Sequence, residues 1–289
     1  MSATGKAAVF LGPGKGYEIQ EFEVPAPEPG GIVVKVTMGG ICGSDLHIWR
    51  GDSPMFAMMI GGVGGHEMTG RVHSLGAGVT NDSLGRPLKE GDRVAYAYFY
   101  PCHRCYNCNK GEMATCPNKL MTMGASISKF SGAYGQYYYL KPGGWVFKVP
   151  DAISDEVATP VNCALSQVTY GLQKAGMRYG DTVVVQGAGG LGLNAIAVAK
   201  EMGADAVIVI DGVSNRLELA KRFGADEVID ISKVTSWAER VAKVKALTGG
   251  RGGDIVVEVV GVPDVINEGL KRLAAWTQRR VRATTRAQV

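Results

Sequence analysis

The segment Thr182-Val-Val-Val-Gln-Gly-Ala-Gly-Gly-Leu-Gly192 decides how the second half of this chain is expected to fold. Its first five residues form a short β-branched run, which is typical of a buried strand. A G-x-G-x-x-G turn follows, and the Ala-rich stretch 193–202 is helix-prone. A helix N-terminus behind such a turn can bind a pyrophosphate through backbone amides, so the segment predicts a dinucleotide site. The candidate residues are Gly187, Gly189, Gly190, Leu191 and Gly192.

The next strand-like run supports this interpretation. Residues 206–210 are apolar and end at Asp211. A carboxylate at the end of that strand can accept hydrogen bonds from both ribose hydroxyls and repels a 2′-phosphate, which favours NAD over NADP. Further strand-like runs at 228–231 and 255–260 alternate with helix-like segments such as 214–223, and this alternation predicts parallel βαβ units.

The first half of the chain has a different texture. Short β-branched or aromatic segments, such as 32–37 and 93–98, are bounded by glycine or proline and predict strands and loops. Helix signals are almost absent before Pro150, and helical spacing begins at 157–174. We therefore expect a β-rich domain over residues 1–155 and an α/β domain over residues 156–289.

Composition and charge exclude several classes of protein. The chain has 289 residues, 46% hydrophobic and 20% charged, as in ordinary globular proteins. Because neither a signal sequence nor an apolar run of membrane-spanning length is present, we expect a cytoplasmic protein with no membrane partner. The net charge of +4 comes from the basic segment 271–289, without which it would be −2. The nearly neutral body gives no reason to expect a nucleic-acid partner.

Four of the six cysteines lie in one short segment, Cys102-His-Arg-Cys105-Tyr-Asn-Cys108 followed by Cys116. This spacing lets four thiolates converge on one tetrahedral ion and leaves no open position, so we expect a structural zinc lobe over residues 102–116. Clustered cysteines in a cytosolic chain indicate metal rather than disulfides. An iron–sulfur cluster is the alternative, although ferredoxin runs end with a shorter gap. His103 is expected to be a solvated loop residue.

A second set of potential metal ligands is spread along the chain: Cys42, His66 and Cys163. One cysteine or histidine alone usually packs in a core, but together these three form a Cys2His set. Three protein ligands with the fourth position open are typical of catalytic zinc. Glycines around His66 would let the backbone approach the metal closely.

With these motifs, the chain resembles the zinc-dependent medium-chain alcohol dehydrogenases from about residue 5 to about residue 270. The matching pieces are Cys42-Gly-Ser-Asp-Leu-His47, Gly65-His-Glu-x-x-Gly70, Gly91-Asp-Arg-Val94, the four-cysteine segment and Asn162-Cys-Ala-Leu165. All six cysteines fall on zinc-ligand positions of that family. The resemblance implies an α/β protein with a GroES-like catalytic domain followed by a doubly wound Rossmann domain, two zinc ions per subunit, and NAD.

The resemblance also implies roles around the catalytic zinc, which the Cys2His set would bind. Glu67 would lie beside the zinc ion as an occasional ligand. Asp45 would not bind the metal itself but would orient the ring of its ligand His66. Ser44 would hydrogen-bond the alcohol, and His47 would carry its proton toward solvent. The alternative for Ser44 and His47 is loop capping and a surface imidazole.

Other positions match the family pattern only in part or not at all. Arg216 stands where relatives have a basic residue near the adenosine ribose, or it is a plain solvated helix residue. Gln167 stands where many relatives have threonine, and His73 matches no family position and is expected to be structural. Relatives continue past residue 270 into further strands, whereas the residue types in 271–289 do not match the sequence pattern of the family. We therefore expect an incomplete Rossmann domain with an atypical basic tail, produced by a frameshift, an early stop or a gene-model error. The alternative is a genuine basic tail.

The implied function is hydride transfer between an alcohol and NAD to give an aldehyde or ketone, with a small-molecule alcohol or carbonyl as partner. Full-length members imply a homo-oligomer, an expectation that the missing strands weaken here, and such a truncated chain should turn over poorly. The alternative is a catalytically inactive, truncated zinc-binding fragment. A nucleic-acid-binding zinc ribbon would explain the lobe and the basic tail, but neither the second zinc set nor the glycine turn.

Overall fold

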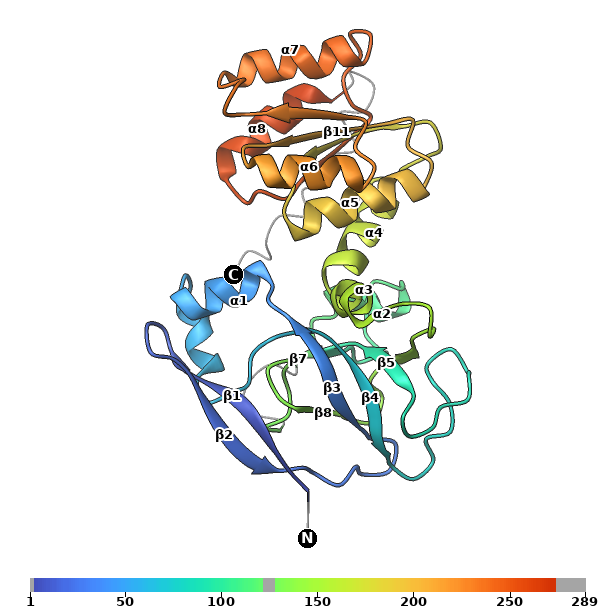
Figure 1. Cartoon of the computed structure of the whole chain (residues 1–289). Helices are drawn as coiled ribbons and strands as arrows, with labels where there is room; N and C mark the ends of the chain where they lie inside the picture. The colour runs from blue at the N-terminus through green and yellow to red at the C-terminus, as the bar shows by residue number, and fades with distance from the viewer. Residues whose placement is uncertain (1–2, 122–127, 274–289) are drawn as a thin grey trace. The chain divides into compact units, whose positions relative to one another are not determined.

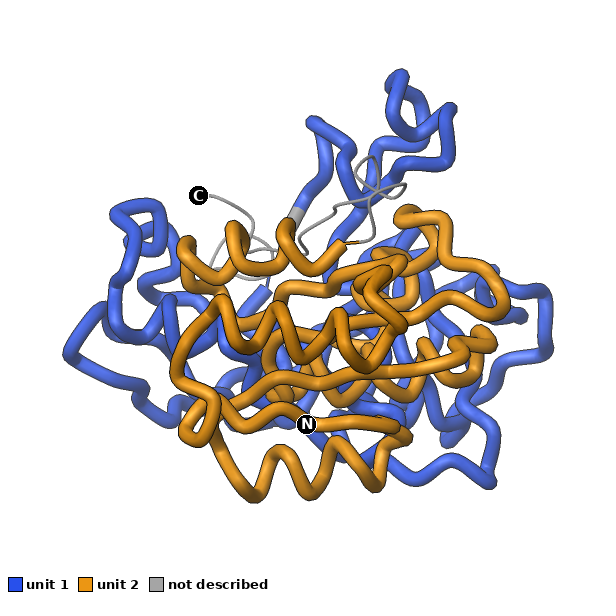
Figure 2. The backbone as a smooth tube through the Cα atoms, turned by 90° about the horizontal axis from the view of Figure 1, so that it is seen from above, with its two compact units in different colours: residues 1–163, 289 blue, residues 164–288 orange. Residues whose placement is uncertain are grey.

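The computed structural model describes residues 3–121 and 128–273, so the basic segment lies outside the described residues from position 274 onward. The chain forms two compact units, one ending at Cys163 and the other beginning at Ala164 (Figure 2). The division lies beyond the expected boundary at residue 155. The reason is that α3 (Asp155–Ala158) and η3 (Thr159–Asn162) pack against strands of the first unit.

An antiparallel sheet of five strands, in the order β8-β3-β4-β5-β9, forms the body of the first unit (Figure 1). Its strands are β3 (Ile32–Gly40), β4 (Glu67–Leu75), β5 (Arg93–Tyr96), β8 (Tyr137–Leu140) and β9 (Val146–Lys148). Alternate apolar side chains, among them Val34, Val72 and Val94, form one buried cluster because successive strand residues face opposite sides. The strands predicted at 32–37 and 93–98 correspond to β3 and β5.

Smaller elements surround this sheet. They are the hairpin β1 (Thr4–Gly12) and β2 (Gly16–Glu23), the pair β6 (Phe99–Tyr100) and β7 (Leu120–Met121), α1 (Gly43–Arg50), η1 (Pro54–Met59), α2 (Tyr106–Asn109) and η2 (Met113–Thr115). The expectation of almost no helix before Pro150 is therefore wrong for α1. Its N-cap is Cys42, in an extended conformation, and its end is Gly51, in the left-handed region, so the helix has an unusual start but an ordinary stop.

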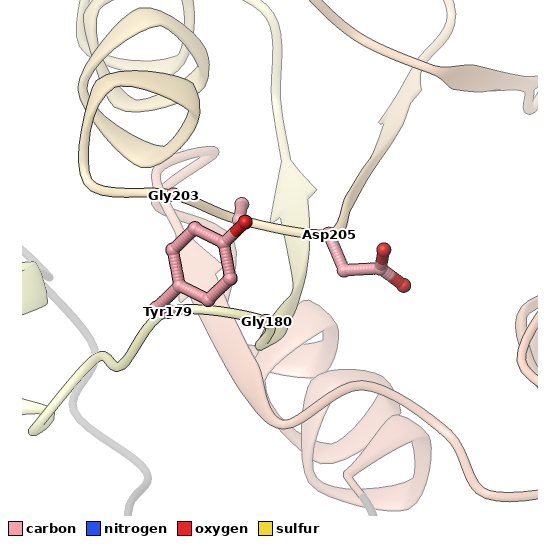
Figure 3. A pocket seen from close by; sticks show the side chains of 5 residues that line it. Tyr179, Gly180, Gly203 and Asp205 are labelled. Atoms are coloured by element: carbon pink, nitrogen blue, oxygen red, sulfur yellow. The ribbon is translucent and has the colours of Figure 1, made fainter.

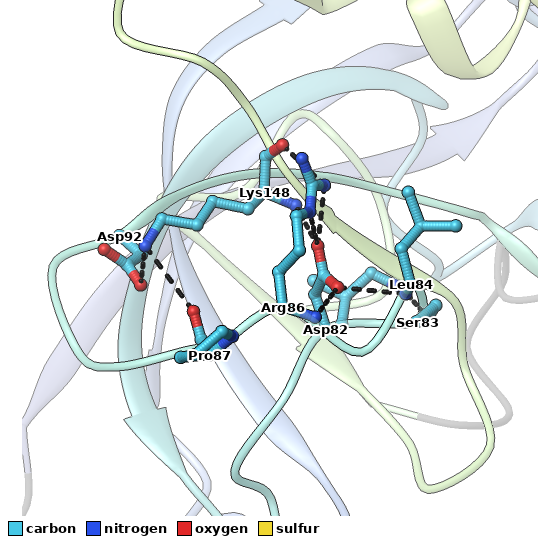
Figure 4. Close-up of polar contacts among 8 residues, drawn as sticks. Asp82, Ser83, Leu84, Arg86, Pro87, Asp92 and Lys148 are labelled. Atoms are coloured by element: carbon cyan, nitrogen blue, oxygen red, sulfur yellow. Dashed lines mark hydrogen bonds and ion pairs between the residues drawn. The ribbon is translucent and has the colours of Figure 1, made fainter.

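A buried carboxylate organises the loop between β4 and β5 (Figure 4). Asp82 accepts hydrogen bonds from the backbone N–H groups of Leu84, Arg86 and Lys148 and from the Arg86 guanidinium, at 2.8 to 3.0 Å. Burial opposes the charge, but these donors outweigh it and hold the pKa of Asp82 well below its usual range. The Lys148 ammonium also pairs with Asp92 at 2.9 Å, which ties the loop to β9.

A parallel sheet in the order β12-β11-β10-β13 forms the second unit. Its elements are α4 (Ala164–Lys174), β10 (Thr182–Gln186), α5 (Gly190–Glu201), β11 (Ala206–Asp211), α6 (Ser214–Arg222), β12 (Glu227–Asp230), α7 (Trp237–Leu247), β13 (Ile255–Glu258) and α8 (Pro263–Arg272). Val183 and Val185 join a cluster with α4, α5 and α6, whereas Val184 joins one with Val244 of α7 on the other face. The sheet is thus doubly wound, as expected.

The helix predicted over residues 157–174 is interrupted. Pro160 lies in η3, and Cys163 follows with φ −130 and ψ −85, outside the helical region, so that α4 begins only at Ala164. Within residues 3–121 and 128–273, no helix has the length and hydropathy of a membrane span.

Candidate active site

Cys42, His66 and Cys163 come together in the first unit from three distant places in the chain. Their ligand atoms all lie within 4.8 Å of one another, and the two Sγ atoms are 4.0 Å apart. Two thiolates on one tetrahedral zinc ion would lie about 3.8 Å apart, given a Zn–S bond of about 2.3 Å. His66 and Cys163 are buried, and Cys42 is half-buried. The set therefore has the size and the donor atoms for one zinc ion.

Local packing fixes the backbone at two of these three positions. Gly65, which precedes His66, has φ 83, and a Cβ added there would lie 2.8 Å from the Tyr134 ring. Only glycine suits that conformation and that contact. At the third ligand, the Asn162 side-chain amide donates a hydrogen bond to the carbonyl oxygen of Tyr96 at 3.0 Å, which ties the turn before Cys163 to β5.

The electrostatics of the set favour a cation at its centre. A hydrogen bond with Cys163 is the main cause that lowers the pKa of Cys42 to about 3, and the same bond raises the pKa of Cys163. Burial opposes a charged His66, but Asp45 and Cys42 outweigh it and raise the pKa of His66 to about 10. Burial and then Cys42 raise the pKa of Glu67. A bound divalent cation would relieve this crowding of acidic groups.

The structure brings most of the predicted companions to this set. Oδ2 of Asp45 accepts a hydrogen bond from the Cys42 N–H at 2.8 Å, and its Oδ1 lies 3.5 Å from Nδ1 of His66. These last two atoms are buried and have no hydrogen-bond partner. Ser44 Oγ lies 3.3 Å from His66 Nε2, and Glu67 is buried at the start of β4.

Sequence reasoning assigned no role to three residues near the set. Tyr134 carries no sequence signal, and Asn162 stood out only as the neighbour of Cys163 in the family motif; both make their contacts through tertiary packing. Asp52 is hydrogen-bonded to Nδ1 of His47. A sequence signal for it does exist. The last turn of α1 contains His47, the helix ends at Gly51, and an acidic residue follows directly.

The four cysteines of the lobe also converge. Cys105 Sγ lies 3.5 Å from Cys108 Sγ and 3.8 Å from Cys116 Sγ, and Cys116 Sγ lies 3.6 Å from Cys102 Sγ. These distances suit four ligands on one ion, whereas the thiolates of an iron–sulfur cluster bind different iron atoms and stand farther apart. His103 is exposed, has φ 55 and packs against the Trp145 ring, so it lies in the loop without being part of the set.

The glycine turn of the second unit joins β10 to α5. Gly187 has φ 98, and a Cβ added at Gly192 would lie 1.9 Å from the Gly187 carbonyl oxygen, so close packing requires glycine there. Because α5 begins at Gly190, the amides of its first turn have no partner within the helix. Amides in this position can donate hydrogen bonds to an anion.

Asp211 ends β11 beside this turn. Its Oδ2 accepts the N–H of Ala188 at 2.7 Å and its Oδ1 accepts the N–H of Val213 at 2.8 Å. The guanidinium of Arg216 is exposed and lies 4.0 Å from the same carboxylate. Asp211 therefore holds the turn together, a structural role that the motif alone did not reveal.

A pocket of about 270 Å³ lies at the amino-terminal ends of two strands of the parallel sheet, β10 and β11 (Figure 3). It is lined by turns that precede β10 and β11, with Tyr179, Gly180, Gly203, Ala204 and Asp205. None of these residues belongs to either cysteine-containing set, and the pocket is separated from the glycine turn by the length of the strands.

Comparisons with known proteins agree with this geometry. Residues 28–151 match the model "Alcohol dehydrogenase GroES-like domain", and residues 190–278 match "Zinc-binding dehydrogenase". The chain is 38% identical over 255 residues to 5-exo-hydroxycamphor dehydrogenase of Pseudomonas putida. The aligned region covers 87% of this chain and 70% of that protein. An alcohol dehydrogenase of Thermotoga maritima has a TM-score of 0.87 at 31% identity, covering 94% of this chain and 75% of that one. An Escherichia coli alcohol dehydrogenase complexed with NADH has a TM-score of 0.78 at 29% identity, covering 93% and 73%.

Proposed function

Because this chain belongs to the zinc-dependent medium-chain alcohol dehydrogenase family, whose members are zinc-binding oxidoreductases, we propose that it transfers a hydride between an alcohol and NAD to give an aldehyde or ketone. The observation that carries the proposal is the convergence of Cys42, His66 and Cys163 beside Ser44. Three protein ligands leave one tetrahedral position for the oxygen of a small-molecule substrate.

The two parts of the chain divide this work in the proposal. The β-rich domain expected over residues 1–155, extended by the turn that carries Cys163, would hold the substrate and both metal sets. The domain that follows would bind NAD. The lobe of Cys102, Cys105, Cys108 and Cys116 would hold a structural zinc ion, because four ligands leave no position for a substrate.

Around the Cys2His set, the side chains would hold and move a proton. When bound, zinc supplies Lewis-acid chemistry at the substrate oxygen, and the nicotinamide takes up or returns the hydride. Asp45 would keep the His66 ring oriented, and Glu67 would serve as an occasional ligand. Ser44 would accept the proton of the substrate hydroxyl while passing its own to His47, which releases it to water. In the direction of reduction, the same groups would deliver the proton.

The cofactor would bind across the glycine turn. Amides of Gly189, Gly190 and Leu191 would face the pyrophosphate at the start of α5. The Asp211 carboxylate has about four lone-pair positions, of which two are used by Ala188 and Val213. The others can accept ribose hydroxyls, with Arg216 near the same edge. A 2′-phosphate would meet the negative charge of Asp211, which supports NAD over NADP.

Hydride transfer is tested with the zinc-loaded chain, NAD and a panel of primary and secondary alcohols, by following NADH absorbance. His66→Gln should lose both zinc at this site and NADH formation. His73→Gln, the same change at an exposed histidine of strand β4, which begins directly after His66, should keep both. If no alcohol of the panel gives NADH while zinc is bound, the proposal fails and the inactive zinc-binding fragment is the better description.

A further inference from the structure

His47, the proton carrier of the proposed function, has a carboxylate partner to which that function assigns no role. Nδ1 of His47 is hydrogen-bonded to Oδ2 of Asp52, two residues beyond the end of α1. The side chain of His47 is 23% exposed and that of Asp52 is 43% exposed. The pair therefore stands partly in water, whereas His66 is buried.

The helix α1 orders these groups from the metal set outward. Ser44 Oγ lies 3.3 Å from Nε2 of His66. His47 follows Ser44 by three residues, and residues three apart lie on the same side of a helix, with their Cβ atoms about 5–6 Å apart. Asp52 comes next, at the end of the helix. From the metal set outward, the order of the groups is thus a buried metal ligand, a hydroxyl, an imidazole and a half-exposed carboxylate.

The backbone holds Asp52 in this place without help from its carboxylate. Its N–H donates a hydrogen bond to the carbonyl oxygen of His47 at 3.1 Å. Gly51 turns the chain with φ 72, and a Cβ added there would lie 2.7 Å from the Pro13 side chain. The cap of α1 is therefore made by backbone atoms and by glycine. The Asp52 carboxylate is not needed to end the helix, so its contact with His47 calls for another explanation.

We infer that Asp52 is a positioning residue that holds His47 in the tautomer with its hydrogen on Nδ1. In that form the ring donates Nδ1–H to the carboxylate and carries its lone pair on Nε2, the nitrogen that takes up a proton. The inference rests on the proposed function, in which His47 receives the proton of the alcohol. It adds the residue that selects which ring nitrogen receives it.

The step balances as a proton transfer. The substrate O–H bond breaks, its proton goes to the Ser44 oxygen, and the Ser44 proton goes to Nε2 of His47. The hydride leaves the carbinol carbon with its electron pair for the nicotinamide. The imidazolium so formed is stabilised by the Asp52 carboxylate and by the negative end of the α1 dipole, since His47 lies in the last turn. It then returns its proton to water.

The tautomer can be measured without turnover. The sequence has four histidines, so ¹⁵N-histidine labelling gives few signals, and those of His47 are identified by their loss in His47→Gln. At a pH at which the spectrum shows the ring to be neutral, the unmodified zinc-loaded chain should carry the hydrogen of His47 on Nδ1. Asp52→Ala should move the hydrogen largely to Nε2, and Asp151→Ala, at an exposed aspartate of the same unit, should change nothing. A neutral His47 with its hydrogen on Nε2 in the unmodified chain overturns the inference, whether or not a variant folds.

Kinetics give an independent readout. Asp52→Ala should lower kcat of alcohol oxidation by about tenfold to a hundredfold, which is no more than the lower end of the about 10²–10⁴-fold that an acid–base group itself contributes, because Asp52 acts only through His47. His47→Gln/Asp52→Ala should be no slower than His47→Gln alone, since Asp52 acts only through His47. An additive loss in the double variant would mean that Asp52 acts on the fold and would overturn the inference. If the unmodified chain forms no NADH, the proposed function fails, and the tautomer measurement still decides the inference on Asp52.

Discussion

Replacing Asp211 by alanine is expected to loosen the glycine turn and to weaken NAD binding at the same time. The carboxylate accepts two backbone hydrogen bonds, one from Ala188 in the middle of the turn and one from Val213 after β11. The substitution therefore removes a contact within the protein as well as the proposed acceptor of the ribose hydroxyls. Stability and affinity should fall together.

The two backbone bonds differ in what their loss costs. Ala188 is fully buried, so its N–H would be left without a partner, which costs about 1–3 kcal/mol. Val213 is exposed, so its N–H can turn to water, and its loss is worth about 0.5–1 kcal/mol. The free energy of unfolding of the second unit should fall by roughly 1.5–4 kcal/mol. A loss of two ribose bonds worth about 2 kcal/mol together raises the Kd of NAD about 30-fold.

Thermal unfolding and fluorescence titration with NADH and NADPH measure both effects. NADPH should lose less affinity than NADH, because the repulsion between Asp211 and the 2′-phosphate disappears with the carboxylate. Asp205→Ala, at an exposed aspartate before the same strand, should leave both measurements unchanged. The reasoning is refuted if Asp211→Ala unfolds at the temperature of the unmodified chain, or if the unmodified chain prefers NADPH.

Three further outcomes are expected. Gly192→Ala should weaken NAD binding at least about tenfold, because the new Cβ meets the Gly187 carbonyl at 1.9 Å and must push α5 from β10; unchanged affinity by titration would contradict this packing. Cys105→Ala should remove one of two zinc ions in elemental analysis and destabilise the lobe, since structural zinc is worth on the order of 10 kcal/mol; visible absorption from iron in the unmodified chain would contradict the zinc assignment. Asp82→Ala should cost about 3 kcal/mol in urea unfolding at neutral pH. Because the folded pKa of Asp82 is lowered, its contribution is present above the ordinary aspartate pKa of about 3.9 and is lost as pH falls through the folded value; a difference that stays constant into strong acid would show that the carboxylate's charge is not the cause.

The sequence predicted best those features that depend on short spacings. The cysteines of the lobe and the glycine turn are local motifs, and their geometry follows from a few consecutive residues. The strands at 32–37 and 206–210 were recognisable because their β-branched runs are bounded by turn residues. The helix predicted over 157–174 was drawn too long, because helical spacing alone does not show that Pro160 and Cys163 interrupt it.

Contacts made by tertiary packing had no equivalent signal. The Tyr134 ring lies against Gly65, and Asn162 reaches the backbone of β5, through chain segments far from their partners. Helix α1 was missed because it has only eight residues and its N-cap is a cysteine rather than serine, threonine or aspartate. The structural use of Asp211 by the glycine turn was hidden because one carboxylate can serve both a ligand and the backbone.

The two cysteine-containing sets differ in how soon a growing chain can complete them. Cys102 and Cys116 are 14 positions apart, whereas Cys42 and Cys163 are 121 apart. At about 5–20 residues per second, the ribosome delivers Cys163 roughly 6–24 seconds after Cys42, while the lobe is complete within about three seconds. The lobe can therefore capture its ion during translation, but the other set must wait until long-range strand pairing has formed. In a zinc-poor cell, newly made chains should accumulate with the lobe filled and the second set still awaiting metal.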